Sequence, residues 1–356
     1  MIMAVLLIVF GGLYFANNKQ FKGYPIKIGA TYPESGNFAI YGESLRNGSI
    51  LAVEEVNRNG GINGRPFEII YFDNQGDLTL AISSVNRFIN IDKVPIILNS
   101  FEFLSLATKN IVEKNKTVMI MSTTYKLTKD DYSSYVFRDY WDFGLIGESF
   151  SLAANKIGSN KIGIIAQSDA SFNSFKSSFV SNLSGKIVIE ERFQYGTKDF
   201  KTQLSKLNNS DMDTIVVFAF PVEASIILKQ MHDLGMNKYK LIITEASESF
   251  VKESNKQFLE KVNAITYLGS ELPEKQKEFI EKYQKRFDGQ IPRADAMYIY
   301  EDVLLLADAL KDCEKNSNVT GSCIASKIGN EFDQYHNKSR NLPIVQFKNG
   351  LKPFDL

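Results

Sequence analysis

From residue 26 onward, short apolar runs alternate with amphipathic stretches, and this alternation limits the fold more than any other feature of the sequence. The run at residues 67–72 is apolar on both faces, which is typical of a strand buried inside a parallel sheet. Between residues 78 and 89, apolar side chains recur every three or four positions after Asp77, which indicates a capped amphipathic helix. Because parallel strands need a crossover helix between them, the pattern predicts an α/β fold with a doubly wound parallel sheet.

The alternation restarts after about residue 140, which predicts a second doubly wound lobe. A length of 356 residues suits two lobes of about 150 residues each. The sequence contains no literal repeat, low-complexity tract or long linker, so we expect short crossings between the lobes. The predicted strands lie at residues 26–32, 67–72, 94–98, 117–121, 161–166, 186–192, 214–219, 240–244, 263–268 and 343–348, the last before an Asn349-Gly350 turn, and two long helices are predicted at residues 274–287 and 294–312.

An uncharged stretch at residues 2–16 precedes a polar stretch at residues 17–23. The length of the uncharged stretch suits the apolar core of a secretion signal better than a membrane span, which needs about 20 residues. No basic residue precedes the stretch, no cysteine follows it for lipid attachment, and Tyr14-Phe15-Ala16 is a poor cleavage site, so an uncleaved anchor is the alternative. We interpret residues 1–23 as a signal or anchor segment with a linker, and expect an exported protein in the periplasm or at the outer face of the cytoplasmic membrane.

Charge and residue composition argue against nucleic acid binding and against catalysis. The 41 basic and 41 acidic side chains balance, so no strong field favours a polyanion. Acid–base and nucleophilic catalysis usually need a histidine near the nucleophile, and both histidines, His232 and His336, have the sequence context of scattered surface residues. Asp73, Asn74 and Asp77 do not supply the ligand pattern of a calcium loop, and no zinc ligand set can be assembled. We therefore expect no enzyme, no cofactor and no metal site.

Cys313 and Cys323 are the only cysteines, and they enclose nine residues of flexible composition. In an oxidising compartment, a disulfide that closes this loop would stabilise the fold by roughly 3 kcal/mol in the chain-entropy model. Two unpaired thiols are the alternative. Because the bridge agrees with the independent export signal, we predict a disulfide between the two residues.

Four motifs occur together within residues 26–77. A strand leads into a Pro-x-Ser-Gly turn at residues 33–36, a Tyr41-Gly42 pair follows, the next helix ends at Asn59-Gly60-Gly61, and an acidic turn follows the second strand. Together they closely resemble the opening of leucine/isoleucine/valine-type periplasmic binding proteins, and the similarity continues with uneven strength to the end of the chain. A nucleotide-binding lobe would show a glycine-rich phosphate loop instead, which Gly29-Ala30-Thr31 does not supply.

The resemblance implies two lobes joined by three crossings, with a ligand cleft between them. Lobe 1 then comprises residues 24–140 and 269–335, and lobe 2 comprises residues 141–268 and 336–356. Ligands of open parallel sheets bind beyond the carboxyl ends of the strands, which independently favours such a site. We expect a monomer that closes by a hinge on a small polar metabolite, an amino acid or a related amine or amide, and delivers it to an ABC permease. The alternative is a ligand-sensing ectodomain of the same fold that signals to a membrane partner.

The resemblance also implies ligand contacts at the ends of second-lobe elements. Family members that bind amino acids hold the ammonium group with an acid at the end of a second-lobe strand, and Glu245 resembles that acid. Phe172 and Phe220 stand where second-lobe aromatic residues pack on the ligand. Helix capping is the alternative role for Glu245, and a place in the core is the alternative for either phenylalanine.

First-lobe contacts follow from the same resemblance. Tyr41 matches a tyrosine of the cleft wall, with a core position as the alternative. Ser122 and Thr124 resemble the loop that offers backbone N–H groups and a hydroxyl to a ligand carboxylate, with an ordinary polar turn as the alternative.

The main departure from the family lies at residues 99–105, where relatives carry a serine-rich turn that holds an anion at a helix start. Here Glu102 and Phe103 fall on or next to the serine positions. A carboxylate at a helix N-terminus would compete with a ligand carboxylate for the same donors and repel it. The sequence therefore admits a cationic or neutral ligand, unless a shifted register places Ser100 or Ser105 in the anion site.

Overall fold

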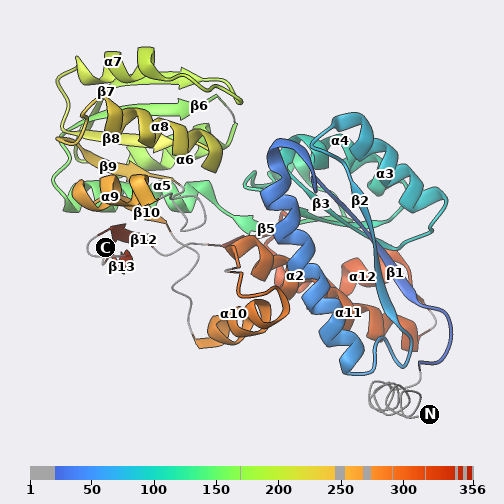
Figure 1. Cartoon of the computed structure of the whole chain (residues 1–356). Helices are drawn as coiled ribbons and strands as arrows, with labels where there is room; N and C mark the ends of the chain where they lie inside the picture. The colour runs from blue at the N-terminus through green and yellow to red at the C-terminus, as the bar shows by residue number, and fades with distance from the viewer. Residues whose placement is uncertain are drawn as a thin grey trace, which may run out of the picture. The chain divides into compact units, whose positions relative to one another are not determined.

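The computed structural model describes residues 21–168, 170–244, 253–267, 274–290, 292–316, 318–340, 344–347 and 351–354, and the chain divides into two compact units (Figure 1). Unit 1 comprises residues up to Ser122, Lys129–Phe137 and Asp295–His336, and unit 2 comprises Thr123–Thr128, Arg138–Ala294 and Asn337–Leu356. The chain thus passes between the units at residues 137–138, 294–295 and 336–337, in addition to the short excursion at Thr123–Thr128. In this division helix α10 (Glu274–Arg286) groups with unit 2, whereas the sequence assigns it to lobe 1.

The first sheet has six strands in the order β11-β5-β4-β3-β1-β2. The pairings of β1 with β2 and β3, of β3 with β4 and of β5 with β11 are all parallel. Every residue of β3 and β4 is buried, as the apolar runs in the sequence predict. Four predicted strands are confirmed within two residues at each end. The strands are β1 (Ile26–Tyr32), β2 (Phe67–Asp73), β3 (Ile96–Ser100), β4 (Val118–Ser122), β5 (Val136–Trp141) and β11 (Asn337–Arg340).

Helices cover both faces of this sheet. The steps from β1 to β2 and from β2 to β3 run in opposite directions across the sheet, so right-handed crossovers place α2 on one face and α3 and α4 on the other. The Asp77 carboxylate accepts a hydrogen bond from the Leu80 N–H at 2.9 Å, which confirms the predicted cap of α3. The helices of unit 1 are α2 (Ala39–Arg58), α3 (Leu78–Asn90), α4 (Glu102–Lys114), α11 (Ala294–Lys315) and α12 (Gly321–Ile328).

The second sheet has seven strands in the order β13-β12-β10-β9-β8-β6-β7. Its strands from β6 to β10 pair in parallel, and β12 runs antiparallel to both β10 and β13. The predicted strands of the second lobe are confirmed, whereas the Asn349-Gly350 turn lies outside the described residues. The strands are β6 (Lys161–Gln167), β7 (Lys186–Phe193), β8 (Thr214–Phe218), β9 (Lys240–Ile243), β10 (Ile265–Tyr267), β12 (Ile344–Phe347) and β13 (Leu351–Pro353).

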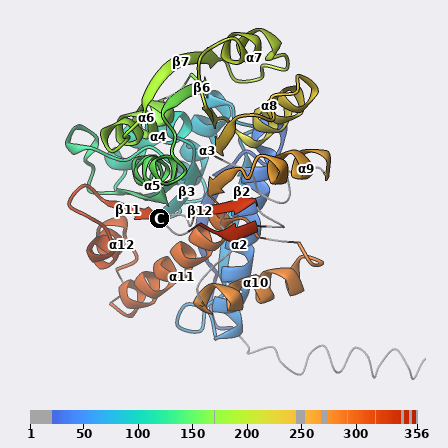
Figure 2. The same ribbon diagram turned by 90° about the vertical axis from the view of Figure 1, so that its left-hand side faces the viewer.

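In unit 2, α5 packs on α6 on one side of the sheet, and α7, α8 and α9 follow one another along the other side (Figure 2). Phe200 at the start of α7, Leu228 of α8 and Phe258 of α9 are buried in one apolar cluster with residues of the strands. Burying this face is what makes the short amphipathic helices stable. The helices are α5 (Phe143–Lys156), α6 (Ala170–Ser181), α7 (Lys201–Asn208), α8 (Pro221–Asp233) and α9 (Glu253–Lys261).

The sequence analysis missed strands β5 and β11, because charged residues interrupt their apolar pattern. Arg138 and Asp139 of β5 are both fully buried. The Asp139 carboxylate accepts two hydrogen bonds from the Arg340 guanidinium, each at 2.7 Å, and lies 3.5 Å from the Lys338 ammonium group. The charge of Asp139 is thus neutralised by charges on the parallel partner strand, so polar residues form the buried strand β5 beside the partly buried strand β11.

The predicted disulfide is confirmed: Cys313 of α11 is bonded to Cys323 of α12. The predicted long helices at residues 274–287 and 294–312 are also present, as α10 and α11. Among the residues that the structure describes, none of the helices combines the length and the apolar character that crossing a bilayer requires.

Removing the disulfide is expected to lower the free energy of unfolding by about 3 kcal/mol, because the bridge closes a loop of 10 residues in sequence separation. Urea unfolding of the oxidised protein and of the double variant Cys313→Ala with Cys323→Ala measures the difference. Adding a reductant should lower the stability of the unmodified protein and leave the double variant unchanged. Equal unfolding midpoints of the two proteins under oxidising conditions would contradict the expectation.

Candidate functional site

The loops that follow β1, β3 and β4 leave the first sheet at the same edge, because these strands are parallel. Loops at the carboxyl ends of parallel strands are where such sheets bind ligands. Tyr41, Glu102, Phe103 and Ser122 lie in these loops or directly beside them. The sequence therefore brings four of its predicted site residues to one edge of unit 1.

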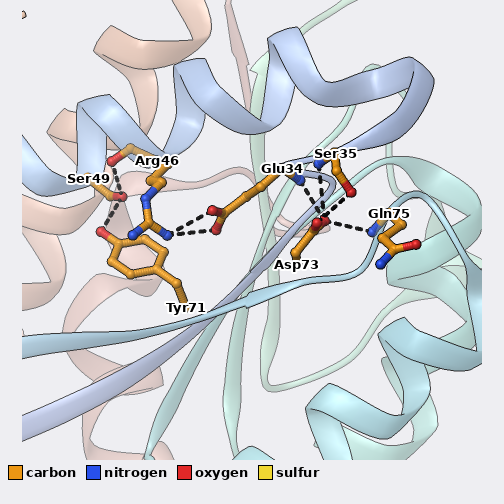
Figure 3. Close-up of polar contacts among 7 residues, drawn as sticks. All are labelled: Glu34, Ser35, Arg46, Ser49, Tyr71, Asp73 and Gln75. Carbon is orange, nitrogen blue, oxygen red and sulfur yellow. Dashed lines mark hydrogen bonds and ion pairs between the residues drawn. The ribbon is translucent and has the colours of Figure 1, made fainter.

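The Asp73 carboxylate at the end of β2 fixes the loop after β1 (Figure 3). It accepts hydrogen bonds from the backbone N–H groups of Glu34, Ser35 and Gln75 at 2.8, 3.2 and 2.9 Å, and from the Ser35 hydroxyl at 2.6 Å. Burial by itself raises the pKa of Asp73, but the Ser35 hydroxyl and the backbone donors outweigh burial, so the pKa lies below its usual value. The Asp73 carboxylate thus joins the Pro-x-Ser-Gly turn to the acidic turn by hydrogen bonds.

A second polar network anchors the same loop to α2 (Figure 3). The Glu34 carboxylate accepts hydrogen bonds from Arg46 Nη1 at 2.8 and 2.9 Å, and the guanidinium lies 4.1 Å from the centre of the Tyr71 ring. The Tyr71 hydroxyl lies 2.9 Å from Ser49 Oγ. Burial raises the pKa of Tyr71 to about 12, although the Ser49 hydrogen bond and the Arg46 charge act in the opposite direction. The charges and hydroxyl groups of this network are paired with one another, and the Glu34–Arg46 ion pair holds the loop after β1 against α2.

The glycine of the Tyr41-Gly42 pair is required by the close approach of α2 to the turn. A Cβ atom at Gly42 would lie 2.1 Å from the backbone carbonyl oxygen of Pro33, so only glycine lets α2 approach the loop this closely. The neighbouring Tyr41 is buried, with 5% of its surface exposed, and its ring meets that of Phe101 edge-on at a centroid distance of 5.6 Å.

Four aromatic side chains from the loops after β1 and β3 and from the first turns of α2 and α4 form what we call the aromatic platform: Phe38, Tyr41, Phe101 and Phe103. Ring centroids lie 4.6 Å apart for Phe38 and Phe101, 6.3 Å for Phe38 and Phe103, and 6.2 Å for Phe101 and Phe103. The solvent exposure of the platform residues differs: Tyr41 is buried, Phe38 and Phe101 are half-buried, and Phe103 is 46% exposed. Gly76, with φ of 73°, leaves room for the Phe38 ring, which a Cβ atom there would approach to 2.8 Å.

Phe101 has an unusual backbone, with φ of 60° and ψ of 142°, just before α4 begins. Residues other than glycine pay about 1–3 kcal/mol for such a conformation, which persists only where neighbours hold it. Its N–H donates to the Ser122 carbonyl oxygen at 3.2 Å, and its carbonyl oxygen accepts from the Ser105 N–H at 3.0 Å. Glu102 and Phe103 are consequently the first two residues of α4.

The two serines that the sequence offered as alternatives are both buried. Ser105 Oγ donates to the carbonyl oxygen of Ser100 at 3.3 Å. The structure thus places Glu102 and Phe103 at the start of α4, and which residue occupies the family's anion site remains a prediction.

Ser122 is the buried last residue of β4, and its carbonyl oxygen joins the loop after β4 to the loop after β3. Thr124 is half-buried and belongs to the short segment that groups with unit 2. Contact of either residue with a ligand remains a prediction.

In unit 2, the two phenylalanines predicted for the site have different environments. Phe172 is fully buried, its ring 5.2 Å from that of Phe218, with the Arg192 guanidinium 3.8 Å from its centre. This packing favours the core role that the sequence left open for Phe172. Phe220 is half-buried at the N-cap of α8, and its ring lies 6.1 Å from that of Tyr195. Glu245 lies outside the described residues.

Sequence reasoning missed Glu223, an acid in the first turn of α8 with only 2% of its surface exposed. Its Oε1 accepts a hydrogen bond from the Gly196 N–H at 2.9 Å, whereas its buried Oε2 has no hydrogen-bond partner among the described residues. Burial, with the Glu223 charge, raises the pKa of Tyr195 to about 12. The available signal was an acid two residues after Pro221, the residue that starts the helix shortly after the buried strand β8.

His232 Nδ1 lies 3.8 Å from the Asp233 carboxylate, and His336 Nδ1 lies 3.3 Å from the Val136 carbonyl oxygen. The His232 side chain is 59% exposed, as expected from the sequence. His336 is only partly exposed, and its ring stacks on Phe137 with a centroid distance of 4.2 Å. Within the described ranges, no three or more His, Cys, Asp or Glu side chains gather in a way that could hold a metal ion.

Comparison with known proteins identifies the family. Residues 25–336 match the family described as Periplasmic binding protein, and the chain belongs to this family. It is 26% identical over 247 residues to Leu/Ile/Val-binding protein homolog 2 of Brucella abortus, an alignment that covers 65% of this chain and 61% of that protein. Membership of a family of binding proteins agrees with the expectation that the chain is not an enzyme.

Solved structures show the same fold. The branched-chain amino acid transporter substrate binding protein LivJ from Streptococcus pneumoniae, solved in complex with isoleucine, matches with a TM-score of 0.80 at 22% identity, covering 92% of this chain and 99% of that one. A solute binding protein from R. palustris, solved in complex with benzoate, matches with a TM-score of 0.76 at 18% identity, covering 92% and 94%. These matches confirm the predicted two-lobed α/β fold.

Replacing Gly42 by alanine is expected to destabilise the protein, although alanine favours a helix by about 1 kcal/mol over glycine. The added methyl group would meet the backbone of Pro33, which cannot move without breaking the Asp73 network. Thermal unfolding of Gly42→Ala checks this. Gly329→Ala is the matched control, since a Cβ atom there has nothing within 4 Å. A Gly42→Ala variant as stable as the unmodified protein would show that the loop adapts freely.

Replacing Asp73 by asparagine is expected to lower the free energy of unfolding at pH 7 by about 1–3 kcal/mol, since the carboxylate holds four donors. Because the folded state lowers the pKa of Asp73, its stabilisation is full above the unfolded pKa and is lost as pH falls through the folded pKa. The difference between variant and unmodified protein should therefore narrow below about pH 4. Urea unfolding at pH 7 and pH 3, with exposed Asp130→Asn as control, measures it; a difference that does not depend on pH would count against the carboxylate.

Proposed function

We propose that this chain is the extracytoplasmic binding component of an ABC transporter. It binds a small polar metabolite, an amino acid or a related amine or amide, between two lobes that close by a hinge, and delivers it to a permease. The match of residues 25–336 to the family of periplasmic binding proteins is the observation that carries this proposal. The uncharged stretch at residues 2–16 supports export to the periplasm or to the outer face of the cytoplasmic membrane.

The relatives support an amino acid or a similar molecule without fixing it. The name of the Brucella abortus protein refers to leucine, isoleucine and valine, and the chain spans 61% of that protein's length. The Streptococcus pneumoniae protein was solved with isoleucine, and the R. palustris protein was solved with benzoate. One fold therefore accepts chemically different ligands, and the loops at the strand ends decide among them.

We propose that the ligand contacts Tyr41, Glu102, Phe103, Ser122 and Thr124 from the first lobe. Phe220 and Glu245 contact it from the second lobe, and Phe172 stands behind them as a core residue. Loops of both sheets leave at the carboxyl ends of parallel strands, which supports this assignment. Hinge closure is supported by the few places where the chain changes unit, at residues 137–138, 294–295 and 336–337 besides the short segment Thr123–Thr128, because few residues would need to rotate.

A thermal-shift screen of the purified chain against amino acids, amines, amides, small carboxylates and nucleosides tests the proposal. A ligand that binds the folded state raises the melting temperature by mass action, and at 100 times its Kd it stabilises by about 2.7 kcal/mol. The protein is first shown by mass spectrometry to be free of bound small molecules. No shift from any compound would argue against a metabolite-binding function.

Transport and sensing are separated by uptake. Cells in which the gene is deleted should lose uptake of the compound found in the screen, and the restored gene should recover it. Unchanged uptake would reject delivery to a permease and favour the sensing alternative.

Glu245→Gln is expected to weaken binding of an ammonium ligand at least tenfold, because it removes the carboxylate partner of a shielded charge. Isothermal titration calorimetry with the compound from the screen measures the change. Glu148→Gln, an exposed glutamate of α5, is the control and should bind as the unmodified protein does. Equal affinities of all three proteins would remove Glu245 from the site.

A further inference from the structure

We propose that the ligand is an organic cation without a carboxylate, an alkylated or quaternary ammonium compound, and that its cationic group packs on the aromatic platform beside Glu102. This inference rests on the proposed binding function and names the ligand class of the same site. It follows from the chemistry of each unit taken by itself.

The aromatic platform offers apolar surface with a negative electrostatic face. Phe103 is 46% exposed at the start of α4, and the half-buried rings of Phe38 and Phe101 contact it and each other. An exposed phenylalanine in the first turn of a helix at a ligand-binding edge costs solubility without helping the core. Ring faces attract alkylated ammonium groups, which also bury their methyl groups there.

Glu102 supplies a formal negative charge at the same place. It lies in sequence between the platform residues Phe101 and Phe103, in the first turn of α4. The N-terminus of a helix otherwise favours an anion, and here a side chain of the protein already supplies that anion. An incoming carboxylate would meet a like charge, whereas an incoming cation would meet both the charge and the ring faces.

Phe101 indicates that this arrangement is held in place against a backbone cost. Its φ of 60° belongs to a region that glycine occupies at no cost, yet phenylalanine stands there. Glycine at position 101 would relieve the backbone and remove the ring that joins Phe38, Tyr41 and Phe103. Strain of this kind is found where a side chain is needed for binding.

Unit 2 supports the same ligand charge independently. Its strand ends carry a second acid among aromatic rings, Glu223 beside Tyr195 and Phe220. Only 2% of the surface of Glu223 is exposed, and its Oε2 has no hydrogen-bond partner in the part of the chain that the structure describes. A buried carboxylate oxygen without a donor is costly and is stabilised by a nearby cation.

Isothermal titration calorimetry with choline tests the inference, with 3,3-dimethylbutan-1-ol as the neutral probe of the same shape. The full chain, free of bound small molecules, should bind choline at least tenfold more tightly than the neutral alcohol. Glu102→Gln should weaken choline binding at least fivefold and leave binding of the alcohol unchanged. Phe103→Leu should weaken choline binding by a similar factor, since it removes a ring and keeps an apolar side chain.

Matched controls are Glu148→Gln, on the exposed side of α5, and Tyr24→Leu, which removes an aromatic residue that is 87% exposed and outside the platform. Both should bind choline as the unmodified protein does. Melting temperatures without ligand show whether each variant is folded. If Phe103→Leu does not fold, Glu102→Gln alone tests the inference.

The outcomes separate this inference from the proposed function. Binding of leucine or another amino acid without binding of choline overturns the inference and leaves the proposed function intact. Equal affinity for choline and the neutral alcohol overturns it in favour of an apolar ligand. Choline binding that survives both variants places the cation elsewhere and overturns the assigned site. Silence toward choline and toward the whole screening panel rejects the inference and the proposed function together.

Discussion

The fold depends on one buried positive charge, the guanidinium of Arg138. An isolated charge in the protein interior is prohibitively unfavourable, so every donor needs a partner. The guanidinium donates to the carbonyl oxygens of Thr123 and Trp141 and to Ser339 Oγ. Asp142 completes the group: burial raises its pKa, but the Ser339 hydrogen bond and the Arg138 charge outweigh burial and lower it. Segments separated by up to 201 residues must meet before this charge is satisfied.

These segments adjoin three of the places where the chain passes between the units, at residues 122–123, 137–138 and 336–337. A charged hydrogen-bond network has few alternative arrangements, because shifting one member leaves another unsatisfied. Aromatic contacts such as that of His336 on Phe137 tolerate small shifts more readily. We infer that a hinge, as proposed for ligand binding, rotates the backbone next to the Arg138 network and leaves the network itself unchanged.

The sequence predicted the elements whose pattern is local. The bounds of β1, the Asp77 cap and the Cys313–Cys323 bridge depend on neighbouring residues, and all were predicted. Strands β5 and β11 were missed because their charges become compatible with burial only when Asp139 meets Arg340, 201 residues away. The position of Glu102 at a helix start was predicted from its alignment. The burial of Glu223 and the gathering of Phe38 with Phe103 were not, since both depend on contacts between distant loops.

In the proposed site, the charge at the start of α4 would restrict the ligand more than the sheet topology does. A helix N-terminus favours an anion by about 0.3–2 kcal/mol. Two like charges about 4 Å apart repel by about 4 kcal/mol at an effective dielectric constant of 20, so in the proposed site the charge of Glu102 would outweigh the effect of the helix on a ligand carboxylate. The hydrogen bonds of Phe101 to Ser122 and Ser105 fix where α4 begins, and therefore which residue stands first. The strand order of unit 1 does not depend on this residue. In the proposed site, a change of side chain at one helix start would therefore alter the preferred ligand charge without altering the fold.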